Sequence, residues 1–449
     1  MNTLRRAGTL RPMRRLGLIV LAACHTNQAS VDAPGVVDAA PVVPTANPAR
    51  EVIDTKLAFD VSAKSATATI TLGPSDAPGA SLETGDLTID SVTIAGAPLM
   101  FAATTTGPTK AGLELALPPS ASPTAVDIAY RYKERATFTG ASTAGYTLIW
   151  PYYCGNLFPC HSDPADGTTF SLAITGVAAG KTAIFAPTIP GQAPAYQIAW
   201  TIDAYTELPL GATTAGTNVS VWYVGDPTNA MAGSAHLVAA FDWLEKTLGP
   251  YQFGDHVGTV SVSWPRGAFG GMEHHPRWHV AAAAMASEET QVHEASHGWF
   301  GDGIRIACWE DFVLSEGTVS YLAGRALDVV APSVGASVWS SYATALAGIP
   351  ATSPVWPTTC GTIDIIADNL FTNAPYMRGA FFYRAVALKI GAAQLDAALH
   401  AFYMAHMLKP ARMSEMLTTI KDVTGFDPTA CAELWLHGTT IPAIGACPQ

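Results

Sequence analysis

Two histidines four residues apart, His293 and His297, constrain the fold of this chain more than any other feature. Residues at this spacing share one face of a helix, so both imidazoles can bind one metal ion. Glu294 lies between them, placed to accept a proton from water rather than to ligate. Glu316 follows after eighteen residues, a gap that fits a loop and the start of a second helix. Two imidazoles, one carboxylate and an open fourth position predict a catalytic zinc site; the alternative is an ordinary helix with solvated His and Glu side chains.

The sequence around these residues favours the zinc interpretation. It reads H-E-A-S-H-G-W-F-G from His293 and W-E-D-F-V-L-S-E-G from Trp309. Both halves resemble the aminopeptidase N family of zinc metallopeptidases (gluzincins), which also includes leukotriene hydrolase-type enzymes. The resemblance implies one Zn²⁺ per chain held by His293, His297 and Glu316, with Glu294 as the general base. The chain departs from the family pattern at three positions, none of them a ligand: Asp302, Ser315 and Thr318.

A second motif resembles the family's substrate-binding strand. Gly270-Gly271-Met272-Glu273-His274 is similar to the G-A-M-E-N sequence that lies along the substrate backbone in the family. Glycines allow a peptide to approach closely and to pair as an added strand. The resemblance assigns Gly270, Gly271 and Met272 to substrate binding and Glu273 to the free α-ammonium group, although Glu273 could instead be a solvated loop carboxylate. His274 replaces the family Asn, and with His275 it is interpreted as a hydrogen-bonded pair rather than as a metal ligand.

Two further positions concern the chemistry of the carbonyl group and the amino terminus. Tyr376, in a segment that resembles the family's Y-x-K-G, is predicted to donate a hydrogen bond to the oxyanion; the alternative is a core aromatic. Arg378 keeps the positive charge of the family Lys. The family often supplies a Gln upstream of its F-P-C motif, and this chain has none there. Trp150 lies in that region, either as a wall of the first-residue pocket or as core.

The predicted architecture is an N-terminal antiparallel β saddle domain followed by a thermolysin-like, mostly helical catalytic domain. Short alternating runs separated by Gly, Pro and Asp predict strands over residues 50–225, and Phe158-Pro159-Cys160 followed by Thr168-Thr169-Phe170 resembles the family's F-P-C…A-T-F signature. Residues 226–449 form the predicted zinc domain, with helices expected over 230–248, 289–300, 311–327, 380–388 and 393–408. No residues remain for the family's C-terminal helical domain, so two domains are expected.

The N-terminus predicts export. Residues 1–23 carry five Arg and no acid before a short apolar run, as in a signal peptide. Leu21-Ala22-Ala23-Cys24 resembles a bacterial lipobox, which would make Cys24 the lipidated N-terminus of an outer-membrane lipoprotein; the alternative is an ordinary secretory signal and a secreted protein. Residues 24–49, rich in Ala, Val and Pro, are predicted to form a flexible tether.

The charge and the cysteines bear on partners and compartment. Removal of the signal peptide would take the formal net charge from −12 to −17, and an acidic exported chain offers no electrostatic basis for binding nucleic acid. Peptide substrates are the expected partners; a membrane is expected only through the lipid anchor, and no partner protein is implied. Six cysteines remain after Cys24, and neighbour pairing (154–160, 308–360, 431–447) is the simplest of 15 connectivities.

Three functions remain open at this point. The leading hypothesis is a zinc aminopeptidase of the cell envelope. The second is a zinc hydrolase with endopeptidase or non-peptide activity, such as epoxide hydrolysis. The third, from another class, is a catalytically silent binding module on a zinc-peptidase fold. The sequence does not determine the side-chain preference, the oligomeric state or the physiological substrate.

Overall fold

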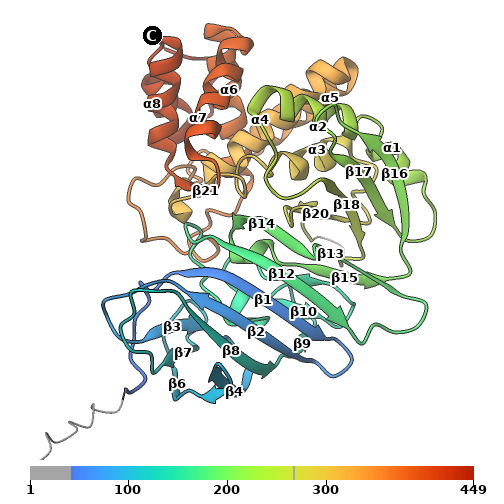
Figure 1. Ribbon diagram of the computed structural model, residues 1–449. Helices are drawn as coiled ribbons and strands as arrows, with labels where there is room; N and C mark the ends of the chain where they lie inside the picture. The colour runs from blue at the N-terminus through green and yellow to red at the C-terminus, as the bar shows by residue number, and fades with distance from the viewer. Residues whose placement is uncertain (1–41, 266–267, 449) are drawn as a thin grey trace, which may run out of the picture. The chain divides into compact units, whose positions relative to one another are not determined.

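The N-terminal part of the chain is built almost entirely from strands (Figure 1). In this computed structural model, which describes residues 42–265 and 268–448, a seven-stranded sheet has the order β14-β12-β1-β2-β8-β4-β5. Its pairs are antiparallel except β1 with β12. Its strands are β1 (Val52–Asp60), β2 (Ser65–Leu72), β4 (Thr88–Ile94), β5 (Ala97–Pro98), β8 (Thr124–Arg131), β12 (Thr168–Thr175) and β14 (Thr188–Ala193).

Three smaller sheets complete this β domain. They are β3 (Ala80–Glu83), β7 (Gly112–Leu115) and β6 (Phe101–Thr104); β9 (Glu134–Arg135), β10 (Gly140–Ser142) and β11 (Thr147–Leu148); and β13 (Thr182–Phe185) with β15 (Trp200–Asp203). Alternate residues of β2 and β8 are buried, including Ala68, Ile70, Val126 and Ile128, because a strand sends successive side chains to opposite faces. The predicted β domain, mostly antiparallel, is confirmed.

The second part is organised around a five-stranded sheet of order β16-β17-β18-β20-β19. The strands are β16 (Thr206–Ala212), β17 (Asn218–Tyr223), β18 (His256–Val262), β19 (Gly271–Met272) and β20 (Arg277–Ala281). The predicted boundary at residue 225 is therefore wrong, since β16 and β17 pair with strands of the catalytic domain. The alternating pattern of β17 identifies a strand but not the sheet that it joins, and the division lies between Asp203 and Thr206.

Helices make up most of the catalytic domain (Figure 1). They are α1 (Thr228–Gly233), α2 (Leu237–Leu248), α3 (Glu288–Ser296), α4 (Phe312–Val330), α5 (Pro332–Ala347), α6 (Asn373–Ile390), α7 (Ala392–His406), α8 (Met413–Thr424) and α9 (Thr429–Ala432). The single helix predicted over 230–248 is wrong: it is broken at Ser234–His236. The Ser234 hydroxyl donates to the Ala230 carbonyl, and the backbone of Gly233 lies so close to Met285 that no side chain would fit.

The last part of the segment predicted as a tether over residues 24–49 is folded, and residues 24–41 lie outside the described residues. Residues 42–49 belong to the folded unit, where Asn47 is buried and donates from Nδ2 to Ser75 Oγ at 3.1 Å. Its backbone N–H donates to Ser81 Oγ at 3.0 Å. Asn47 thus satisfies polar groups of the β domain, which a composition-based argument does not detect. Cys24 and the predicted signal peptide lie outside the described residues.

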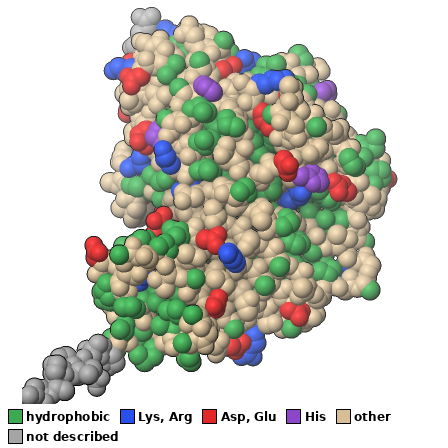
Figure 2. Space-filling model, in the orientation of Figure 1, with side chains coloured by type: hydrophobic (Ala, Val, Ile, Leu, Met, Phe, Trp, Pro, Cys, Tyr) green, Lys and Arg blue, Asp and Glu red, His purple; other side chains and the backbone are tan. Residues whose placement is uncertain are grey.

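The predicted cysteine pairing is confirmed. Disulfides join Cys154 to Cys160, Cys308 to Cys360 and Cys431 to Cys447. Within residues 42–265 and 268–448, no helix is both long and apolar enough to cross a membrane. Figure 2 shows acidic and basic side chains spread in small groups over one face of the molecule, consistent with a chain in which only 13% of residues are charged.

Candidate active site

Helix α3 carries the two histidines, and its N-terminus is well defined. Ser287 is the N-cap, and its hydroxyl accepts a hydrogen bond from the N–H of Thr290 at 3.1 Å. The helix ends at Ser296, four residues earlier than predicted. The N–H groups of His297, Gly298 and Trp299 bond to carbonyls three residues back, which tightens the last turn. His297 keeps helical dihedral angles as the C-cap, so the four-residue spacing still places both imidazoles on one face.

Glu316 and Tyr376 come from two helices that touch. Glu316 lies in the second turn of α4 and Tyr376 in the first turn of α6. At their crossing Gly317 faces Gly379: a methyl group on Gly317 would lie 2.8 Å from the Gly379 Cα, and one on Gly379 would lie 2.5 Å from the Gly317 Cα. Only two glycines allow this approach, which brings the carboxylate of one helix close to the phenol of the other.

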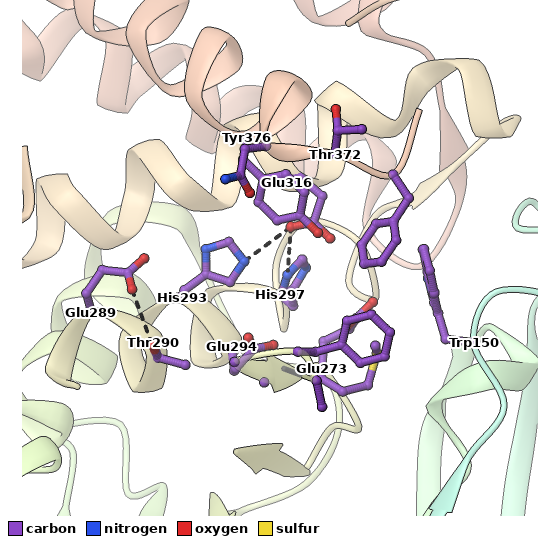
Figure 3. A pocket seen from close by; sticks show the side chains of 17 residues that line it. Trp150, Glu273, Glu289, Thr290, His293, Glu294, His297, Glu316, Thr372 and Tyr376 are labelled. Carbon is purple, nitrogen blue, oxygen red and sulfur yellow. Dashed lines mark hydrogen bonds and ion pairs between the residues drawn. The ribbon is translucent and has the colours of Figure 1, made fainter. Parts of the chain in front are cut away.

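The three predicted ligands converge. His293 Nε2 lies 3.2 Å and His297 Nε2 lies 3.5 Å from Glu316 Oε2, and all three side chains are buried (Figure 3). His297 Nδ1 lies 3.0 Å from the Phe300 carbonyl, so this nitrogen carries the proton in the neutral ring and leaves Nε2 free to ligate. Two imidazole nitrogens and a carboxylate facing one point match the donors that zinc prefers. The residues therefore fit a zinc ion.

Each of the three predicted ligands changes the pKa values of the other two. Burial alone would raise the pKa of Glu316, but the charge of His297 and hydrogen bonds from both imidazoles outweigh it and lower this pKa to about 2. Burial would lower the pKa values of His293 and His297, yet the interactions with Glu316 raise both. A cation at the centre of the three side chains would replace the imidazolium protons that now balance the carboxylate.

Glu294 does not join the three converging side chains. Its carboxylate faces β19, and burial raises its pKa well above the ordinary value, with the nearby carboxylates adding to the shift. Its side chain is 5% exposed and lines the same cavity as the ligands. A buried carboxylate with a raised pKa is suited to take up and return a proton.

Gly271 is required by the position of Glu294. A methyl group at Gly271 would overlap with the carboxylate of Glu294, whereas one at Gly270 would meet only Thr290 Cγ2, at an ordinary 3.5 Å. We expect Gly271→Ala to lower kcat/KM for peptides by roughly 10- to 100-fold, because a displacement of about 1 Å at a catalytic group is costly. Gly270→Ala should have the smaller effect, and equal losses in the two variants would contradict this account.

Glu273 lies at the end of β19, in the short connection to β20, and is 5% exposed. Burial raises its pKa, and no Lys or Arg side chain lies within ion-pair distance of it in the described part of the chain. The solvated-loop alternative is therefore excluded. A buried carboxylate that faces the cavity of the zinc ligands and pairs with no Lys or Arg among the described residues is suited to bind an ammonium group.

An aromatic wall borders the cavity on the side of the β domain. Trp150 lines the cavity and packs on Phe371 at a ring separation of 4.6 Å, and Phe371 packs on Phe269 at 5.3 Å (Figure 3). Trp150 is thus both packed and part of the pocket wall. The wall residues Phe269 and Phe371 were missed from the sequence, as were Glu289, Thr290, Thr372 and Asn373. Of these, Glu289 could have been found, because it lies four residues before His293 on the same helical face.

Other residues singled out in the sequence have structural roles. His275 is hydrogen-bonded to the Tyr251 hydroxyl through Nδ1 and to the Glu294 carbonyl through Nε2, as expected. His274 differs: it is buried, and both of its ring nitrogens lack a partner in the described chain. Arg378 faces away from the cavity and donates to the carbonyls of Leu434 and Gly438.

The fold and the site together define the class of protein to which this chain is similar. A β domain precedes a mixed sheet and helices that hold two histidines and a glutamate from successive helices, with a further carboxylate beside them. This is the arrangement of a zinc metallopeptidase.

Comparisons with known proteins agree with this class. Residues 271–435 match the Peptidase family M1 domain. A stretch of 171 residues is 24% identical to aminopeptidase N of Streptomyces lividans and covers 36% of this chain but only 20% of that protein. The fold resembles an M1 zinc metallopeptidase variant of Deinococcus radiodurans bound to the substrate Tyr-Ser-Ala (TM-score 0.76, 19% identity, 88% of this chain and 96% of that one). It also resembles yeast LTA4 hydrolase in complex with bestatin (TM-score 0.73, 18% identity, 92% and 71%).

The catalytic part of this chain is thus similar to peptidase family M1 over residues 271–435. Its β domain and helical catalytic domain match the fold of the structures above, which confirms the predicted fold class. The matched stretch is less than a third of the length of the first curated relatives, so their activities are treated below as a proposal.

Proposed function

We propose that this protein is a zinc-dependent aminopeptidase that binds one zinc ion per chain and removes the first residue of peptides. The observation that carries the proposal is the convergence of His293, His297 and Glu316 beside two further buried carboxylates, Glu294 from α3 and Glu273 from the end of β19. The first is placed for proton transfer and the second for holding an amino terminus. A silent binding module would have no need of both.

Zinc, when bound by His293, His297 and Glu316, supplies Lewis-acid activation of water and of the substrate carbonyl. Glu294 takes one proton from the attacking water and later gives it to the nitrogen of the leaving amine, so that water is added across the peptide bond. Tyr376 donates a hydrogen bond to the carbonyl oxygen as negative charge develops there. Burial and three nearby carboxylates raise the pKa of Tyr376 well above its ordinary value, which keeps the phenol protonated.

The substrate is held by backbone hydrogen bonds and by an ion pair at its amino terminus. Among the strands that the structure describes, β19 is at the edge of its sheet and its outer edge is unpaired, so a peptide can add to it as a strand. The carboxylate of Glu273 binds the α-ammonium group, and this contact limits cleavage to the first residue. The side chain of that residue faces the aromatic wall of Trp150, Phe269 and Phe371, which favours an apolar first residue.

Glu273→Ala tests the restriction to amino termini. We expect the variant to lose about 100-fold in kcat/KM on Leu-initiated peptides, since the loss of one partner of a desolvated charge pair costs roughly 2–5 kcal/mol. Wild type should release Leu from the free peptide but not from its N-acetylated form, and the release from the free peptide should stop with a chelator. Mass spectrometry of the released residue measures each rate.

The matched control is Asp422→Ala, which removes an exposed carboxylate on α8. It should behave as wild type. Internal cleavage of the acetylated peptide by wild type at a comparable rate would overturn the aminopeptidase restriction and favour an endopeptidase. Absence of any cleavage by the zinc-loaded protein would overturn the enzymatic proposal as a whole.

We also propose that the protein is exported and anchored by a lipid on Cys24. Three disulfides support export, because such bonds persist in oxidising compartments. The basic and then apolar N-terminus supports a signal peptide. Metabolic labelling with a fatty acid, lost in Cys24→Ser, tests the anchor.

A further inference from the structure

Glu289 is a carboxylate of the catalytic cavity for which the mechanism above has no role. It lies in the first turn of α3, is half-buried and lines the cavity of about 470 Å³ that contains the zinc ligands. Its Oε1 accepts a hydrogen bond from the Tyr342 hydroxyl at 2.6 Å, and its Oε2 lies 3.3 Å from the Thr290 hydroxyl. Both partners are neutral, so the negative charge of Glu289 is not compensated by any ion pair in the described part of the chain.

The position of Glu289 relative to a bound peptide follows from β19. Gly271 faces Glu294, Gly270 faces Thr290, and Glu273 lies at the opposite end of the strand. Figure 3 shows Glu289 and Thr290 on one side of His293, and Glu273 and Trp150 on the other. A peptide whose amino terminus is at Glu273 and which pairs antiparallel to β19 therefore runs toward Gly270. The residue after the cleaved bond then lies beside Thr290 and Glu289.

The cavity as a whole is acidic. Four carboxylates line it, and none of its described lining residues is Lys or Arg. Three of the four have a role in the proposed mechanism: Glu273, Glu294 and Glu316. Glu289 remains, held in one orientation by Tyr342 from α5. Glu289 and Tyr342 also line a second cavity of about 330 Å³ together with the hydroxyl groups of Ser287, Ser337 and Ser341, which offers room for a long polar side chain.

We propose that Glu289 selects substrates with a Lys or Arg side chain at the residue immediately after the cleaved bond. The inference rests on the proposed aminopeptidase function and adds the class of peptide that the site prefers. A cationic side chain at this position pairs with a carboxylate that has no other ionic partner in the described part of the chain, whereas an acidic side chain is repelled by the same carboxylate. Tyr342 is a positioning residue that fixes the Glu289 carboxylate.

The test compares peptides that differ only at the second position: Leu-Lys, Leu-Gln and Leu-Glu followed by one common sequence. For wild type we expect a Lys-to-Glu ratio of kcat/KM of about tenfold, the effect of one partly buried ion pair and of the matching repulsion. In Glu289→Gln the ratio should fall to within about twofold of one, and in Glu289→Lys it should be reversed. Added salt should reduce the wild-type ratio, because these charges are partly screened.

Asp422→Asn is the matched control. It makes the same chemical change at an exposed carboxylate on α8 that lines neither cavity. This variant should keep the wild-type ratio. A ratio in Glu289→Gln equal to that of wild type, or a wild-type ratio that salt does not change, overturns this inference alone. A wild type that releases no Leu from any of the three peptides overturns the proposed function and this inference with it.

Discussion

Glu294→Gln is expected to bind zinc as wild type does and to lose at least about 1,000-fold in kcat, within the range that a positioned general base contributes. The change keeps the shape of the side chain, which is packed against Gly271, but removes the group that accepts the proton. Glu294 does not share the convergence point of His293, His297 and Glu316, so the metal site should persist. Metal analysis and the release of Leu from a Leu-initiated peptide measure the two properties separately.

For Glu294 the suitable control is Glu288→Gln, because it makes the same chemical change on the same helix at a residue that does not line the catalytic cavity. Turnover by Glu294→Gln within a few-fold of wild type would show that another group moves the proton. The proposed role of Glu294 would then be wrong, although the metal site could stand.

Glu316→Ala is expected to have the second large effect, the loss of both zinc and activity. The variant leaves only two imidazole ligands. Zinc affinity should fall by more than the roughly 10- to 100-fold that is lost when a residue outside the ligand set is changed. In wild type, zinc at about 100 times its Kd should stabilise the fold by about 2.7 kcal/mol, and thermal unfolding should show a higher Tm. In Glu316→Ala this rise should be absent at the same zinc concentration.

Val329→Ala controls for changes to α4 itself, since Val329 is exposed near the far end of the same helix. It should keep zinc and the zinc-dependent rise in Tm. If Glu316→Ala bound zinc with the same Kd as wild type, the assignment of Glu316 as a ligand would be wrong. The alternative site would then be the second group of possible ligands, Glu273, Glu294 and His297.

The zinc ligands could be predicted from the sequence because their geometry is mostly local. The four-residue spacing of His293 and His297 fixes their common face whatever surrounds the helix. The end of α3 could not be predicted in the same way. Apolar residues continue through Trp299 and Phe300, but these side chains are buried by packing on other elements after the helix has ended. Hydrophobic periodicity does not distinguish a helix from a tight turn that is equally buried.

The pocket wall and the domain boundary depend on contacts between distant segments. Phe371 meets Trp150 across more than two hundred residues, and no local pattern marks either as a cavity residue. The sheet to which β17 belongs is likewise set by its parallel pairing with β18. The sequence of a strand indicates which face is buried but not which neighbour it pairs with. Family resemblance located Glu273 and Tyr376, whose roles spacing alone would not have indicated.

The close contact between Gly317 and Gly379 has a consequence for how the site can adapt. With only hydrogen atoms between them, α4 and α6 cannot separate or slide without losing that contact, so Glu316 and Tyr376 move together as one rigid body. Any adjustment to larger or smaller substrates must then come from outside these two helices. Replacements at Phe269, which lies before β19, are thus expected to alter which peptides are accepted while Glu316 and Tyr376 keep their relative positions.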